Sequence, residues 1–250
     1  MNIFRNVVFV AALAGLCAGI LMAAMQAYAT VPLILHAEVY EQGEHAHDHG
    51  AAAPAAAASS DQQQAAAAAE EEEEWEPADG FERYAFTVLA NIVTGIGFAL
   101  VLVAASELAG GIGNWRDGLI WGLAGFAVFT LAPGLGLPPE LPAMPAADLT
   151  ARQLWWIGTA AATAAGLALI AFRRTLPLAL LGLALIVVPH LIGAPQPESH
   201  ETPIPENLHH SFVVAVTVTN LIFWVALGML VAVFRQRVSI PAGEPRERLA

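Results

Sequence analysis

Long apolar stretches dominate the chain and alternate with short polar connections. Covering about 30 Å of lipid hydrocarbon takes about 20 helical residues, at a rise of 1.5 Å per residue. Six stretches meet or approach that length: residues 7–29, 84–108, 119–135, 154–172, 176–192 and 211–234. The pattern therefore predicts an all-α integral membrane protein, built as a bundle of about six transmembrane helices.

The third and fifth stretches are the shortest, and each carries a proline near its end. These prolines are Pro133 and Pro189. Because of their length and these prolines, either stretch could be a re-entrant or broken segment in place of a full span. Such segments are tolerated where protein shields the backbone from lipid. Five spans is therefore the alternative count.

The first stretch also has features of a cleaved signal peptide. Arg5 precedes it, and Ala27 and Ala29 give the small-x-small pattern of a cleavage site. Its apolar core of about 19 residues is longer than the 7–15 residues usual in signal peptides. We therefore expect an uncleaved helix; cleavage would leave five spans in the same orientation.

Arginine placement predicts the orientation, since arginines in short loops are retained on the cytoplasmic side. With the N-terminus inside, eight of the ten arginines lie inside and only Arg83 and Arg152 lie outside. The inverse orientation would reverse this ratio. We therefore expect both the N-terminus and the C-terminus to be cytoplasmic.

Composition supports a lipid environment. Of 250 residues, 57% are apolar and 13% are charged, whereas soluble domains keep about a quarter of their residues charged. Residues 36–82 hold 13 acids and no base, so removing them from the net charge of −12 leaves about +1. This distribution gives no support for a nucleic-acid partner.

The single cysteine, Cys17, excludes an intramolecular disulfide and a thiolate zinc site.

Composition also divides the chain into four parts. Residues 1–35 hold the first transmembrane helix and an outer extension, 36–83 an acidic outer loop rich in His, Ala and Glu, 84–234 the membrane domain with five further helices, and 235–250 a cytoplasmic tail with arginines. Within the outer loop, residues 50–69 are nearly all Ala and Gln, and five glutamates follow them. We expect this part to be a partly disordered tether.

All eight histidines fall on the predicted outer side, together with 18 of the 22 acidic residues. Neutral imidazole and carboxylate groups suit borderline divalent cations such as Co²⁺, Ni²⁺ and Zn²⁺. The candidate metal ligands are His36, Glu38, His45, His47, His49, Glu140, His190, His200, Glu206, His209 and His210. A solvated polar surface is the alternative interpretation.

The first histidine tract has the spacing of an extended ligand edge. His45, His47 and His49 would place three imidazoles on one side of an extended chain, because side chains alternate there with a period of two. We expect this open segment to collect metal weakly, without one fixed geometry.

The second tract suits a helix. Glu206 would share a helix face with His209 at i+3 and with His210 at i+4, so that two ligands could grip one ion. The same residues also suit the first turn of a helix behind Pro205, with Glu206 at the positive end of the helix dipole. The two interpretations are compatible.

A common outer mouth would bring ligands from separate segments together. His36 and Glu38 follow the first span, and His190 lies near the outer end of the fifth. We expect them to meet His209 there, and His190, His209 and Glu206 to form the more selective metal site.

Polar residues within the spans are candidates for a cation pathway. Gln26, Asn91 and Asn220 would line such a path if they face inward. Polar groups in membrane helices more often bond neighbouring helices, which is the alternative. The pairs Gly15-x-x-x-Gly19 and Gly118-x-x-x-Gly122 predict close helix packing.

Catalytic signatures are absent from the sequence. It contains no H-E-x-x-H and no G-x-S-x-G motif, and the absence of lysine rules out a P-loop. We therefore expect no enzyme, no tightly bound cofactor, and a transported divalent cation as the ligand.

Five patches of the sequence resemble the CbtA family of cobalt-transporter membrane subunits. They are residues 31–41, 136–145, 152–156, 189–195 and 220–224. Together they cover both ends and most of the middle of the chain, while residues 50–74 carry none of them.

The resemblance implies a multi-pass subunit of the bacterial inner membrane that moves cobalt inward for cobalamin synthesis. It also implies a small, single-span, histidine-bearing companion called CbtB. It does not indicate the oligomeric state of the chain. His190, Glu140 and Asn220 lie inside the matched patches. Cobalt rests on this resemblance, because nitrogen and oxygen ligands bind Ni²⁺ more strongly than Co²⁺. A nickel importer and a non-transporting scaffold or metal sensor are the alternatives.

Overall fold

The computed structural model describes residues 2–48, 80–173 and 175–238, and the ordered elements in these ranges are helical. The elements are α1 (Asn2–Ala29), α2 (Val31–Asp48), α3 (Phe81–Glu107), α4 (Trp115–Phe126), the π-helical turn η1 (Ala127–Leu131), α5 (Ala132–Gly136), α6 (Leu149–Arg173), α7 (Leu176–Ile192) and α8 (Glu206–Val238). The predicted all-α bundle is confirmed.

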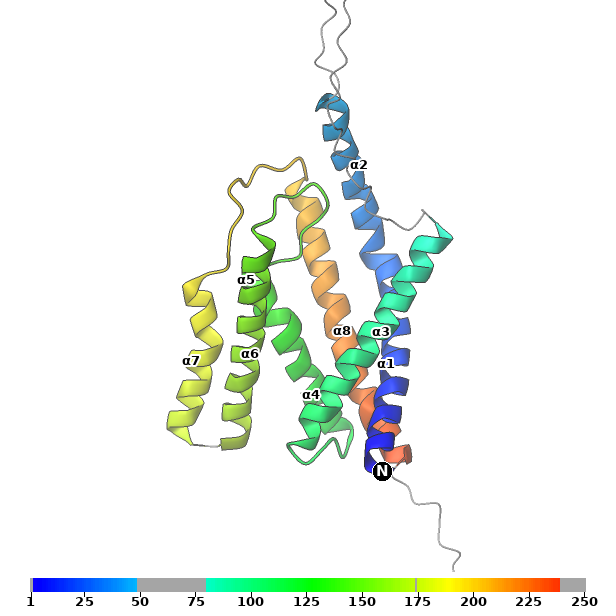
Figure 1. Cartoon of the computed structure of the whole chain (residues 1–250), viewed down its shortest axis with the longest axis vertical. Coiled ribbons are helices and arrows are strands. Elements are labelled where there is room, and N and C mark those ends of the chain that lie inside the picture. Colours follow the sequence, from blue (N-terminus) through cyan, green and yellow to red (C-terminus); the bar gives the residue numbers. More distant parts are fainter. Residues whose placement is uncertain (1, 49–79, 174, 239–250) are drawn as a thin grey trace, which may run out of the picture.

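The chain runs back and forth between two ends of the bundle (Figure 1). One end holds the start of α1, the α3–α4 loop, the end of α6, the start of α7 and the end of α8 (Figure 1). We call it the arginine end, because five of the seven described arginines lie there. The other is the histidine end, which holds α2, the 137–148 and 193–205 loops and the start of α8. Described arginines at the first end are Arg5, Arg116, Arg173, Arg235 and Arg237.

Five helices are long and apolar enough to cross a membrane: residues 4–29, 81–107, 115–136, 149–173 and 206–238. The chain is therefore a multi-pass membrane protein. The remaining predicted span, residues 176–192, is α7, an apolar helix of 17 residues that leads from the arginine end back to the histidine end (Figure 1). Its length, about 25 Å, is at the lower limit for a span.

The third span is continuous but irregular. The chain stays helical from α4 through η1 to α5, and Ala132 N–H donates to Ala127 O in the wider π pattern. Pro133 follows at once. A proline has no N–H to donate and its ring crowds the carbonyl four residues earlier, so a wider turn before it removes the conflict.

The helical segment α2 corrects an expectation from the sequence. The backbone is helical through Asp48, so the tract that includes His45 and His47 is not extended. Positions two apart on a helix do not face each other. The side chains of His45 and His47, and the whole of His49, lie outside the described residues.

Glycines bring three helix pairs into close contact. A Cβ atom at Gly15 of α1 would lie 2.6 Å from the Gly95 oxygen of α3, and one at Gly118 of α4 would lie 2.5 Å from the Gly228 oxygen of α8. Gly166 of α6 meets α7 in the same way. The two predicted small-x-x-x-small pairs therefore do promote close packing, as expected for helices in lipid.

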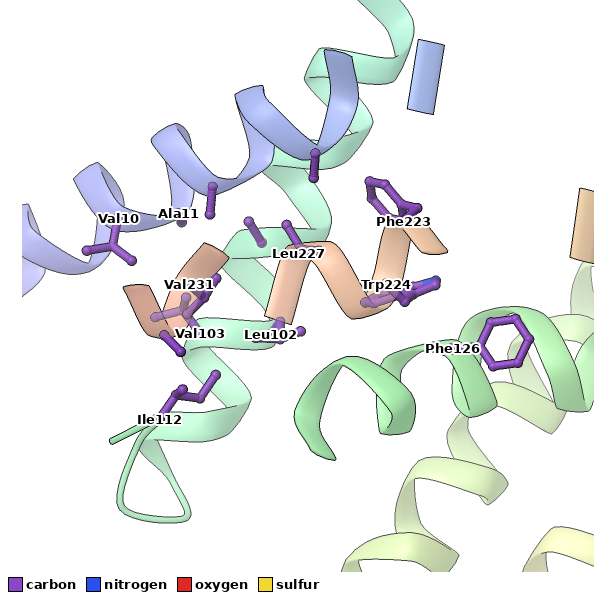
Figure 2. Packing of buried hydrophobic residues seen from close by; sticks show 14 of the residues in the cluster. Val10, Ala11, Leu102, Val103, Ile112, Phe126, Phe223, Trp224, Leu227 and Val231 are labelled. Atoms are coloured by element: carbon purple, nitrogen blue, oxygen red, sulfur yellow. The ribbon is translucent and has the colours of Figure 1, made fainter. Parts of the chain in front are cut away.

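The main core joins the arginine-end parts of α1, α3 and α8. Figure 2 shows Val10, Leu102, Val103, Leu227 and Val231 packed together from these three helices. A second, smaller cluster lies at the histidine end. It consists of Ala37, Leu141, Ile204, Leu208 and Phe212, from α2, the 137–148 and 193–205 loops and the start of α8.

Candidate functional site

Polar side chains from three spans converge between α1, α3 and α8. Asn91 Nδ2 of α3 donates a hydrogen bond of 2.6 Å to Gln26 Oε1 of α1. Gln26 and Asn220 of α8 line the same cavity, which has a volume of about 290 Å³. The three residues predicted for a cation pathway are thus brought to one place.

The cavity lies in the histidine-end half of the bundle. Its lining residues are Met22, Gln26, Thr30, Val31, Ile34, Arg83, Thr87, Phe212, Val216, Thr219 and Asn220. On α3 these residues precede Gly95, where α3 meets α1. Beyond Gly95, toward the arginine end, side chains of the main core fill the space between α1, α3 and α8.

A four-residue spacing places these groups on one side of each helix. Arg83, Thr87 and Asn91 repeat at i+4 on α3, so they lie on one helix face. Gln26 at the end of α1 and Thr30 just after it have the same spacing. Sequence reasoning missed Arg83, Thr30, Thr87 and Thr219 as lining residues, and this spacing is the signal that could have found most of them.

Hydrogen bonds to the helix backbone fix the chemistry that the cavity offers. Thr87 Oγ1 donates to Arg83 O at 2.8 Å, Thr219 Oγ1 to Ala215 O at 2.8 Å, and Asn220 Nδ2 to Val216 O at 2.9 Å. With these donors engaged, the hydroxyl and amide groups can still offer oxygen lone pairs. Neutral oxygens suit a hydrated cation better than they suit an anion.

A charged pair lies at the histidine-end side of the cavity. Arg83 Nη1 lies 3.4 Å from Glu38 Oε2, and Arg83 Nη2 pairs with Glu38 Oε1. The side chains are 35% and 26% exposed, so both are partly screened from water. The pair ties the first turn of α3 to α2.

The other predicted metal ligands are held apart by separate partners. Glu140 pairs with Arg152 at 2.8 Å, and His209 Nε2 lies 3.1 Å from Pro139 O. The His190 ring packs edge-on against Trp155 at 5.9 Å. The His36 ring lies 5.9 Å from the Tyr40 ring, and His200, Glu206 and His210 are exposed.

The expected common mouth is therefore wrong. Within the described ranges, no group of three or more His, Cys, Asp or Glu side chains is placed to hold one metal ion. The reason is helix order: α7, which carries His190, packs mainly against α6, whereas α8, which carries Glu206 and His209, packs mainly against α4 and α1. His190, His209 and Glu206 accordingly do not form one site. The second predicted tract does begin a helix, since α8 starts at Glu206 directly after Pro205.

One comparison with known proteins identifies the family of the chain. A family model described as probable cobalt transporter subunit (CbtA) matches residues 4–236. The chain belongs to this family, as the resemblance of its sequence patches predicts. No curated protein and no solved structure matches it.

Proposed function

We propose that the chain, as a member of the CbtA family, is the membrane-embedded subunit of a cobalt importer in the bacterial inner membrane. Cobalt crosses by way of the cavity between α1, α3 and α8. The observation that carries this proposal is that Gln26 of α1 and Asn220 of α8 line one cavity, and that Asn91 of α3 is hydrogen-bonded to Gln26 beside it. Polar groups in the membrane interior mark substrate pathways when they face a water-filled space.

The cavity suits a cation that keeps its water. Six water molecules occupy about 180 Å³ at about 30 Å³ each, which fits within the cavity of about 290 Å³. Neutral oxygens hold such an ion loosely, and loose binding allows release on the other side. An inside-negative potential favours entry by about 2.3 kcal/mol per charge per 100 mV.

The outer histidines and carboxylates collect the ion before it enters. Because the described ones do not share one site, each binds weakly, and together they raise the local cobalt concentration at the histidine end. Residues 36–83, which contain four of the eight histidines and 13 acids, extend this function. The companion subunit is a single-span, histidine-bearing protein of the CbtB kind, and the imported cobalt serves cobalamin synthesis.

Labelled-cobalt uptake at sub-micromolar metal tests the proposal. Cells that express the chain with its companion should accumulate more cobalt than cells without the chain. Asn220→Leu should abolish most of the difference, whereas the control Thr217→Val should not, because Thr217 lies on the same helix and bonds Val213 O without lining the cavity.

Three results would contradict the proposal. Equal uptake with and without the chain would exclude an importer. Normal uptake by Asn220→Leu would place the path elsewhere. Preferential uptake of nickel in a competition experiment would make the chain a nickel importer.

A further inference from the structure

Arg83 is the charged residue among the described residues that line the cavity, and its charge is positive. The other polar side chains of the lining are five neutral ones, and none of them is a carboxylate. A fixed positive charge repels a divalent cation, and the repulsion grows as the effective dielectric constant falls near lipid. A path for cobalt with a bare guanidinium in its wall would work poorly.

Glu38 supplies the opposite charge from a different helix. Both oxygens of its carboxylate face the Arg83 guanidinium. Its position is set by packing, because the preceding residue, Ala37, is fully buried in the cluster with Leu208 and Phe212 of α8. The fold therefore holds this carboxylate against Arg83.

We propose that Glu38 determines the charge selectivity of the cavity by neutralising Arg83, and that it does not act as a cobalt ligand. This inference rests on the proposed function, since it assigns selectivity to the same cavity. With Glu38 in place, the cavity admits cations. Removing the Glu38 carboxylate makes the cavity wall more positive, so the cavity favours cations less.

Thiol labelling measures the sign of the charge directly. Cys17 is the single cysteine, so Cys17→Ala gives a background without thiols. Thr87→Cys then places one thiol in the cavity wall, one helical turn from Arg83. The readout is the rate of modification by a cationic methanethiosulfonate divided by the rate with an anionic one. Ser211→Cys, exposed at the start of α8, is the control for intrinsic reactivity.

The expected changes have opposite signs for the two partners. Glu38→Gln should lower the ratio at Thr87→Cys by about tenfold, and Arg83→Gln should raise it. The double variant Glu38→Gln/Arg83→Gln should return it close to the parent value. The ratio at Ser211→Cys should stay constant throughout. A reciprocal exchange, Glu38→Arg with Arg83→Glu, should also restore the ratio, and it provides a folded alternative if Glu38→Gln is poorly produced.

Cobalt uptake separates neutralisation from direct binding. Glu38→Gln should lose most uptake, and adding Arg83→Gln should restore it. Continued loss in the double variant would show that Glu38 binds cobalt, which overturns the inference. So would an unchanged ratio in Glu38→Gln, or a Thr87→Cys thiol that a neutral reagent cannot reach.

The two proposals fail in distinguishable ways. The labelling ratio does not depend on cobalt transport. If the parent chain takes up no cobalt while the ratios shift as expected, the importer is excluded and the charge assignment stands.

Discussion

Asn91 of α3 and Gln26 of α1 are joined by a hydrogen bond of 2.6 Å beside the polar cavity. Asn91 Nδ2 also donates to Thr87 O at 2.9 Å, so its amide is held in one orientation. The sequence leaves open whether polar residues in the spans bond neighbouring helices or line a path. Here the Asn91–Gln26 pair does the first, and Gln26 also borders the cavity.

Removing one partner of this pair should destabilise the protein. Asn91→Leu leaves the Gln26 oxygen without its interhelical donor, which costs about 1–3 kcal/mol in proteins generally. Interhelical bonds in membranes average about 0.6 kcal/mol, so we expect about 1 kcal/mol. Thermal unfolding in detergent should show a lower Tm. The double variant Gln26→Leu/Asn91→Leu should lose less unfolding free energy than the sum of the losses in the two single variants. Thr94→Val, on the exposed side of α3, is the control. Strict additivity of the two losses would contradict the coupling between Gln26 and Asn91.

Close glycine packing should tolerate no side chain. Gly118→Ala would place its Cβ 2.5 Å from the Gly228 oxygen, and such overpacking costs about 1–3 kcal/mol. A Cβ atom at Gly158 of α6 would meet no neighbouring atom within 4 Å. Gly158→Ala should therefore leave Tm equal or higher, because alanine favours helix by up to about 1 kcal/mol. Equal losses in both variants would argue against the α4–α8 contact.

The orientation should be measurable with one thiol at a time in the Cys17→Ala background. Ser199→Cys, in the loop at the histidine end, should react with a membrane-impermeant reagent in intact cells. Gln236→Cys, near the end of α8, should react only after permeabilisation, because the arginine end is expected in the cytoplasm. The reverse pattern would invert the proposed direction of transport.

Single outer histidines should contribute modestly. Because His190 and His209 have separate partners, His190→Ala or His209→Ala should raise the cobalt concentration for half-maximal uptake by about two- to threefold, well under 1 kcal/mol. Maximal uptake should stay near the parent value. Complete loss in either variant would show a tight site that includes that histidine.

The tether should matter at low metal concentration. Deleting residues 50–74 removes Asp61 and the five consecutive glutamates 70–74, while it keeps α2. Uptake should fall at sub-micromolar cobalt and recover at high cobalt, since only local collection is lost. Loss at every concentration would mean that the tether does more than collect the ion.

Local patterns predicted most of the helices. Five of the six apolar stretches became long helices, and the two stretches with Pro133 and Pro189 were the ones that proved irregular or short. The helix α2 was missed, because residues 31–48 follow a span and become polar, so hydropathy alone does not separate a helix from a loop there.

Hydropathy and charge along the chain were enough to place the spans and to separate the arginine end from the histidine end. They could not show which helices are neighbours, and hence that Gln26, Asn91 and Asn220 meet while His190 and His209 do not. Lipid is as apolar as the side chains that face it, so hydropathy carries no information about helix partners. Close contacts between small residues select the neighbours instead, and those contacts exist only once the helices have packed.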